Sequence, residues 1–245
     1  CFYDNYLKAI EETKNIVRSP IEILCAEDIK NEVDITGSLK PSSRVRFLRR
    51  ASEEEKLKLA QEVIAEQNPD KKAEMLSTFA FLDKSFPLSH ETIIEYSNSS
   101  HERLREVSFD VLTGCQSCEV REYALKLLAT GKYKAQAIQM LLCNYTSVDK
   151  ALLLSELGKI KVNYNNESDW HSIGSKILKV CDQGIKLPKE FFVYIYETTL
   201  CSCCREYAVR ALAKHHWLTR DIIEECRYDS NYDISQYINS VLSNK

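Results

Sequence analysis

Ten cysteines in 245 residues include two pairs with the spacing Cys-x-x-Cys, namely Cys115 with Cys118 and Cys201 with Cys204. Each pair lies where the sequence predicts the N-terminus of a helix, and the exposed amide groups there lower the pKa of a thiol. Four thiolates can hold a structural zinc ion, and a single pair can carry out redox chemistry. These four cysteines are therefore the candidate metal ligands of the sequence.

The same cysteines also suit ordinary packing, and this is the interpretation we favour. When residues 117–129 and 201–213 are aligned without a gap, Cys204 takes the place of Val120 in an apolar stripe. A buried thiol in such a position behaves as a small apolar side chain. The alignment also sets the two Cys-x-x-Cys pairs two residues out of register. We therefore expect no metal site and no cofactor.

The remaining chemistry-bearing residues do not form a recognisable catalytic pattern. None of the five histidines has a second ligand at metal-binding spacing, except for the adjacent His215 and His216. Neighbouring side chains on a helix point about 100° apart, so such a pair rarely chelates one ion. The sequence contains no P-loop, no G-x-S-x-G, no H-E-x-x-H and no kinase signature. We predict no catalytic residues.

One stretch, Lys40–Arg50, is locally cationic and could contact phosphates. However, Arg49 and Glu53 are four residues apart, as are Arg50 and Glu54, which favours a self-neutralised, solvent-exposed helix face. The whole chain carries a net charge of −3 and lacks the basic excess of most nucleic-acid-binding proteins. A nucleic-acid partner is therefore not expected.

The composition is that of a globular protein, with 44% hydrophobic and 28% charged residues. Only six glycines and five prolines occur, which disfavours Gly-rich phosphate loops and turn-dense β-sandwiches. No apolar run is long enough to span a bilayer, so no membrane partner is expected. Because the cysteines lie within helical patterns, we expect reduced thiols and a cytoplasmic location.

Almost every segment has apolar residues at helical spacing, and no segment alternates as a strand does. Prolines open several of these segments, as Pro41, Pro69 and Pro188 do. Loops are predicted over 33–41 and 161–168. The predicted helices are 3–18, 20–32, 42–50, 53–67, 69–83, 89–97, 101–113, 117–130, 133–144, 147–159, 169–183, 188–199, 203–214, 218–227 and 232–243.

An internal repeat decides the expected fold. Residues 117–129 and 201–213 share Arg-Glu-Tyr-Ala and a following Leu-Ala, a third copy lies at 101–112, and a weaker fourth copy lies at 231–242. Each copy carries one stripe of apolar or small residues, with Ala124 or Ala208 where a neighbouring helix would approach closely. A short helix cannot bury such a stripe alone, whereas stacked neighbours can. The stripe of the copy at 201–213 is Cys204, Tyr207, Ala208, Ala211 and Leu212.

These copies resemble the HEAT-repeat family. Val120–Leu128 and Cys204–Leu212 match its pattern of an apolar residue, Arg, Ala and Leu on the second helix of a pair. The resemblance implies an all-α fold, a right-handed α-α superhelix of helix pairs, with two pairs separating residues 120 and 204. The family's arginine commonly joins neighbouring repeats through an acidic partner; here the corresponding residues are Arg105, Arg121 and Arg205.

The resemblance is best over 101–245, while 1–100 reads as less regular helices that could cap the N-terminal end. We expect one helical-repeat domain over 1–245. The leading functional hypothesis is a non-enzymatic scaffold that binds a protein or peptide along the concave surface of the solenoid. Aromatic residues in the C-terminal third could supply binding hot spots. They are Phe191–Tyr196, Trp217, Tyr228, Tyr232 and Tyr237.

Two alternatives stay open. One is a nucleic-acid-associated HEAT-like protein of the DNA-repair type, which requires a continuous basic groove on the concave face. The other is a zinc- or thiol-dependent module that uses the two Cys-x-x-Cys pairs. The sequence identifies neither the partner nor the oligomeric state.

Overall fold

A computed structural model describes residues 25–80, 86–160 and 167–243, without the side chains of 167–169. Within these ranges every regular element is helical, which confirms the all-α prediction. The predicted helix 3–18 and most of the predicted loop 161–168 lie outside the described residues. The elements are α2 (Ala26–Thr36), α3 (Pro41–Arg50), α4 (Glu53–Ala65), α5 (Pro69–Ala80), α6 (His90–Tyr96), α7 (Glu102–Leu112), α8 (Cys118–Thr130), α9 (Lys134–Cys143), the 3-10 helix η1 (Ser147–Asp149), α10 (Lys150–Leu157), α11 (Glu167–Asp182), α12 (Lys189–Thr198), α13 (Ser202–Lys214), α14 (Arg220–Arg227) and α15 (Tyr232–Ser243).

Local signals explain most helix starts. Pro41 and Pro69 are the first residues of α3 and α5, where a missing N–H costs nothing. Serine or threonine side chains accept a hydrogen bond from a first-turn amide at α4, α6, α8 and α14. The helix boundaries therefore follow from side chains that lie next to them in the sequence.

Helix α2 departs from the prediction, because it continues through the start of the expected loop to Thr36. Its β-branched C-terminal residues have weak helix propensity, but Val33 is fully buried and this packing outweighs the propensity. The helix stops at Gly37, which has a left-handed backbone with φ of 71°.

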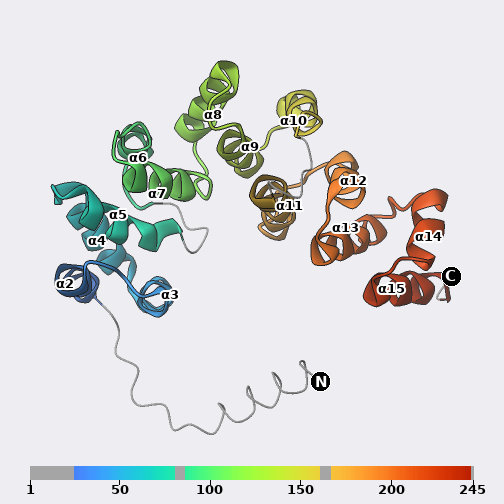
Figure 1. The fold of residues 1–245 in the computed structure, drawn as a ribbon, viewed down its shortest axis with the longest axis horizontal. Coiled ribbons are helices and arrows are strands. Elements are labelled where there is room, and N and C mark those ends of the chain that lie inside the picture. Colours follow the sequence, from blue (N-terminus) through green and yellow to red (C-terminus); the bar gives the residue numbers. More distant parts are fainter. Residues whose placement is uncertain (1–24, 81–85, 161–166, 244–245) are drawn as a thin grey trace, which may run out of the picture.

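The helices form two layers. In the first, α5, α7, α9, α11, α13 and α15 follow one another, and each packs against the next. Figure 1 shows this series along the inner side of an arch, with α6, α8, α10, α12 and α14 on the outer side. Outer helices pack on inner ones, as α8 does on α9 and α12 on α13. The apolar core consists of the side chains buried between these two layers.

The layers correct the expected repeat register. Helices α8 and α13 carry the best-matched copies, yet α8 lies in the outer layer and α13 in the inner layer. Helix α13 is the fifth α-helix after α8, so the step between them is two and a half pairs rather than two. The aligned tyrosines show the difference: Tyr123 is half-buried with its hydroxyl bonded to Ser97, while Tyr207 is 63% exposed.

Tyr207 was expected in the buried stripe of α13, and this prediction is wrong. The buried residues of α13 are Cys204, Ala208, Val209 and Leu212. Because an inner helix is contacted by α11, α12 and α15, its apolar surface is rotated towards Val209 and leaves Tyr207 in solvent. In the described part of the chain, no helix is long and apolar enough to cross a bilayer.

Candidate functional site

A groove with a volume of about 750 Å³ opens where α11 and α13 end. It lies between the C-terminal ends of these two inner helices and residues from the outer layer around α10 and α12. Its apolar lining comes from Tyr145, Ile185, Leu187, Pro188, Phe192 and Trp217, and its cationic lining from Lys150, Lys186 and Lys214.

Two similar helix ends position the groove. Gly184 after α11 and His216 after α13 both have a left-handed backbone, with φ of 91° and 58°. In each case the next amide bonds back to the helix: Ile185 N donates to Val180 O at 3.0 Å, and Trp217 N donates to Leu212 O at 2.8 Å. This arrangement is the Schellman motif, in which the residue after the left-handed one folds back against its own helix. Ile185 and Trp217 reach the groove in this way.

Aromatic contacts hold Trp217 in place. Its ring lies 5.9 Å from that of Phe192, and the imidazole of His215 stacks on it at 4.6 Å. Tyr145, another lining residue, makes an edge contact with the ring of Phe191 at 5.8 Å. Phe192 is buried and Trp217 is half-buried, so the groove has a rigid aromatic floor with one accessible indole.

The rim of the groove is positive. Lys150 forms an ion pair with Glu190 at 2.9 Å, and this hydrogen bond lowers the pKa of the Glu190 carboxyl. No acidic side chain among the described residues pairs with Lys186 or Lys214, both of which are exposed. No carboxylate is among the described residues that line the groove. The geometry therefore suits an anionic ligand with an apolar part.

A second cluster lies at the opposite ends of the same two helices. Cys201 precedes α13 and Cys204 lies in its first turn, while His171 and Ser175 are one turn apart on α11. His171 Nδ1 is 3.8 Å from Cys204 Sγ, and His171 Nε2 is 3.5 Å from Ser175 Oγ. Within 25–80, 86–160 and 167–243, His171, Cys201 and Cys204 are the group whose ligand atoms all lie within 4.8 Å of one another.

The structure does not bring the four candidate cysteine ligands together. Cys115 is buried and donates its S–H to the carbonyl of Val111 at 3.3 Å. Cys118 is exposed and donates to Glu119 at 3.2 Å. The first pair is thus divided between the core and the surface, and the second pair has a histidine as its neighbour instead.

The thiol pKa values also differ from the expectation that helix N-termini lower them. Burial raises the pKa of Cys115 to about 11. Burial likewise raises the pKa of Cys204 to about 11, and the adjacent Cys201 adds to the effect. For Cys118, the hydrogen bond to Glu119 raises the pKa. Desolvation and a neighbouring carboxylate outweigh the helix dipole at these positions.

The three repeat arginines have different partners. Arg121 on α8 donates to Asp149 before α10, with Nε 3.2 Å from Oδ2. Arg205 on α13 pairs with Glu225 at 3.0 Å and Asp229 at 3.3 Å. Arg105 donates to the carbonyl of Ser99 at 3.1 Å. Ala124 and Ala208, the small residues of the same copies, are fully buried.

The cationic stretch is less neutralised than expected. Ala51 and Ser52 separate α3 from α4, so Arg49 and Arg50 do not share a helix with Glu53 and Glu54. Glu53 pairs with Lys56, and Glu54 with Lys58. Within the stretch, Arg44 pairs with Glu74 at 2.8 Å, whereas Arg46, Arg49 and Arg50 are exposed on α3.

The aromatic residues of the C-terminal third separate into core and surface. Phe191, Phe192 and Tyr196 are buried, while Tyr228 and Tyr232 are 78% and 68% exposed. Tyr237 lies under the guanidinium of Arg210 at 4.4 Å. Only Phe192 and Trp217 of this set line the groove.

Comparison with models of protein families and with curated proteins found no match for this chain. The groove and the His171 cluster are therefore the features on which a function can be proposed. Sequence reasoning missed His171, Lys186 and Lys214, because their neighbours come from other helices and no local spacing marks them. The aromatic excess was the one signal that pointed to Trp217.

Proposed function

We propose that the paired helices form a HEAT-like repeat that winds as a right-handed superhelix. The alternation of inner and outer helices supports this, as does the contact of each inner helix with the next. In such an array each unit packs mainly on its neighbours, which leaves long edges and grooves exposed for binding.

On this scaffold we place a non-enzymatic binding site for an acidic protein segment that carries an apolar anchor residue. The observation that supports it is the half-buried Trp217 on the floor of a groove whose exposed lysines, Lys186 and Lys214, have no acidic partner among the described residues. A preorganised aromatic in a pocket is the usual centre of a binding hot spot, and complementary charge at the rim guides the partner.

We prefer this groove to the concave surface as the binding site. Two hollows lie between inner helices, with volumes of about 170 and 390 Å³, and both are smaller than the groove. Their linings include Asp110 together with basic residues, and the two arginines of one hollow, Arg44 and Arg103, both contact Glu74. Charges that are mixed in sign or already paired contribute less to binding than an apolar groove floor with exposed lysines that are unpaired among the described residues. We therefore expect the partner to bind at the groove.

A selection from a random peptide library on the immobilised protein tests the proposal. We expect enriched peptides to carry an aromatic or aliphatic residue flanked by Asp or Glu. Labelled copies of these peptides then give dissociation constants by fluorescence polarisation. Trp217→Ala should weaken binding at least about 30-fold, as loss of a hot-spot residue does. Because that variant also removes core contacts, the surface variant Lys186→Glu with Lys214→Glu gives a second measurement, with an expected loss of about 10-fold.

Tyr228→Ala is the matched control, because this tyrosine is exposed and does not line the groove. It should bind the peptides as the unaltered protein does. The proposal would be overturned if the selection enriched no common sequence pattern. It would also be overturned if the double charge reversal left the affinity of the selected peptides unchanged.

The exposed arginines of α3 favour the nucleic-acid alternative as a second candidate. If it holds, a labelled single-stranded DNA oligonucleotide should bind with strong salt dependence. Replacing Arg46, Arg49 and Arg50 by glutamine should then abolish that binding while leaving peptide binding at the groove intact. Absence of DNA binding at low salt would remove this candidate.

A further inference from the structure

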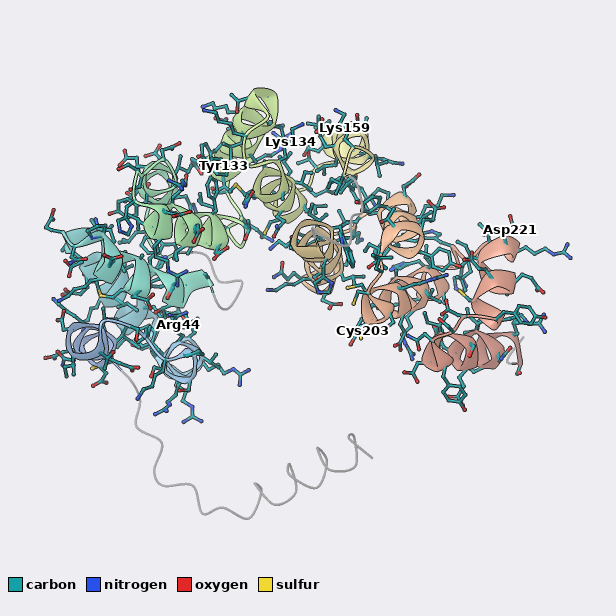
Figure 2. The ribbon with its side chains drawn as sticks, in the orientation of Figure 1. Arg44, Tyr133, Lys134, Lys159, Cys203 and Asp221 are labelled. Atoms are coloured by element: carbon teal, nitrogen blue, oxygen red, sulfur yellow. The ribbon has the colours of Figure 1, made fainter. Side chains whose placement is uncertain are left out.

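We propose that His171, Cys201 and Cys204 form a zinc site that joins α11 to α13. The three ligand atoms lie within 4.8 Å of one another and come from two helices of the inner layer. Figure 2 shows the neighbouring Cys203 at the end of α13 that lies next to α11. The site is separate from the groove, which lies at the other ends of these helices.

The distances fit tetrahedral coordination. With usual Zn–S and Zn–N bond lengths, an imidazole nitrogen and a thiolate sulfur on one zinc ion are about 3.6 Å apart. His171 Nδ1 and Cys204 Sγ are 3.8 Å apart before any metal is considered. The sulfur of Cys201 lies within 4.8 Å of both and needs to move by about 1 Å or less to reach a common centre. A side-chain rotation at the exposed start of a helix can supply that movement.

Ser175 supplies the second-sphere contact that such sites require. It lies one turn after His171 on α11, with its Oγ 3.5 Å from Nε2 and 3.8 Å from Cys204 Sγ. A proton on Nε2 would point at Ser175, which leaves the Nδ1 lone pair directed towards the sulfur atoms. A hydrogen bond to the far nitrogen is the usual means by which proteins fix the tautomer of a metal-binding histidine.

The donor set selects the class of metal. Two thiolates and one imidazole are soft to intermediate ligands, and zinc prefers them in a tetrahedral arrangement. Binding replaces the S–H protons of Cys201 and Cys204 by bonds to zinc, so two protons leave as the ion enters. Because His171 is exposed, an ion can reach the site from solvent, and because Cys204 is buried, the site is partly desolvated.

Zinc titration of the reduced, chelator-treated full chain tests this assignment. In competition with a chromophoric chelator, we expect one zinc per chain. Cobalt substitution should give the intense near-ultraviolet bands of cobalt–thiolate bonds. Cys201→Ser and His171→Asn should each weaken zinc binding more than about 100-fold, beyond the usual effect of a second-sphere change. Both residues are more exposed than Cys204, so their loss should leave the far-ultraviolet circular dichroism unchanged.

Cys118→Ser is the matched control, since it removes an exposed thiol of the other Cys-x-x-Cys pair. It should bind zinc like the unaltered chain. Ser175→Ala should weaken binding about 10-fold, as removal of a second-sphere partner does. The proposal fails if the chain binds less than one zinc at micromolar concentration. It also fails if Cys118→Ser costs as much affinity as Cys201→Ser, because the ligands would then lie elsewhere.

Discussion

Gly184 and His216 both have a left-handed backbone just after a helix, but only glycine adopts that conformation without strain. A left-handed backbone costs an L-residue about 1–2 kcal/mol, and glycine avoids this cost. Gly184→Ala should therefore lower the free energy of unfolding by about 1 kcal/mol, although nothing lies near the added Cβ. His216→Gly should leave it unchanged or raise it by up to about 1 kcal/mol. Urea denaturation measures both, and a stabilised Gly184→Ala would contradict the described backbone.

Asp149 is the buried member of an ion pair and should make the protein sensitive to acid. Burial by itself would raise the pKa of Asp149, but hydrogen bonds from Arg121 and Thr146 outweigh it and hold the pKa below its ordinary value. The unfolded chain therefore takes up a proton at higher pH than the folded chain does. The stability from this contact is complete above the ordinary pKa and is lost as the pH falls through the lower, folded value.

Asp149→Asn should lower the free energy of unfolding by about 2 kcal/mol at neutral pH. Below about pH 4 the difference from the unaltered chain should shrink. Glu206→Gln removes the exposed pair with Arg210 and serves as the control, with a cost below about 0.5 kcal/mol. Equal effects of the two substitutions, measured by urea denaturation across this pH range, would show that the Arg121 contact has no special role.

At the scale of helices, the small buried residues Ala124 and Ala208 allow close approach of the neighbouring helix. Leucine at either position should overpack the interface and lower the free energy of unfolding by about 1–3 kcal/mol. Ala151→Leu on the exposed face of α10 is the control and should be near neutral. Thermal unfolding with unchanged midpoints for Ala124→Leu and Ala208→Leu would contradict the packing of α8 and α13.

The sequence predicts the helices well because their signals are local. Periodic apolar residues, prolines at helix starts and side-chain caps all act within a turn or two, and α4, α5 and α7 lie within a few residues of their predicted bounds. Val33 shows where this fails, because its burial against other helices lets α2 continue past the predicted helix end at residue 32. Tyr207 fails for the same reason, since the face that α13 buries depends on which layer it occupies.

The candidate sites were less predictable, because each joins residues that no spacing connects. Cys204 was evident as part of a Cys-x-x-Cys pair, but its neighbour His171 lies on α11, 33 residues away. Lys186 and Lys214 likewise meet only when the ends of α11 and α13 lie together. Local patterns indicated the thiols and the aromatic residues. The residues that lie next to them in space depend on how the helices pack, which local patterns do not show.

At the scale of the molecule, contacts between successive neighbours predict a chain that tolerates loss of its end. Helices α14 and α15 pack on each other, and α15 packs on α13. A chain ending at Thr219 should stay helical, with a lower unfolding midpoint because Arg205 loses Glu225 and Asp229. All lining residues of the groove precede Thr219, so affinity for the selected peptides should change less than about two-fold. Loss of the helical circular dichroism signal would show that the remaining helices do not fold without α14 and α15.

Helices α11 and α13 pack against each other and connect the candidate zinc site at one end to the groove at the other. Cys204 lies in the first turn of α13 and His171 in the second turn of α11, while the groove lies about 20 Å away at the C-terminal ends of both helices. Zinc bound to these residues would restrict the angle between the two helices and hence the width of the groove at Trp217. Thermodynamic linkage then requires reciprocity: whatever factor zinc changes in peptide affinity, the peptide must change in zinc affinity. Zinc binding at one end of α11 and α13 would in this way change peptide affinity at the other end.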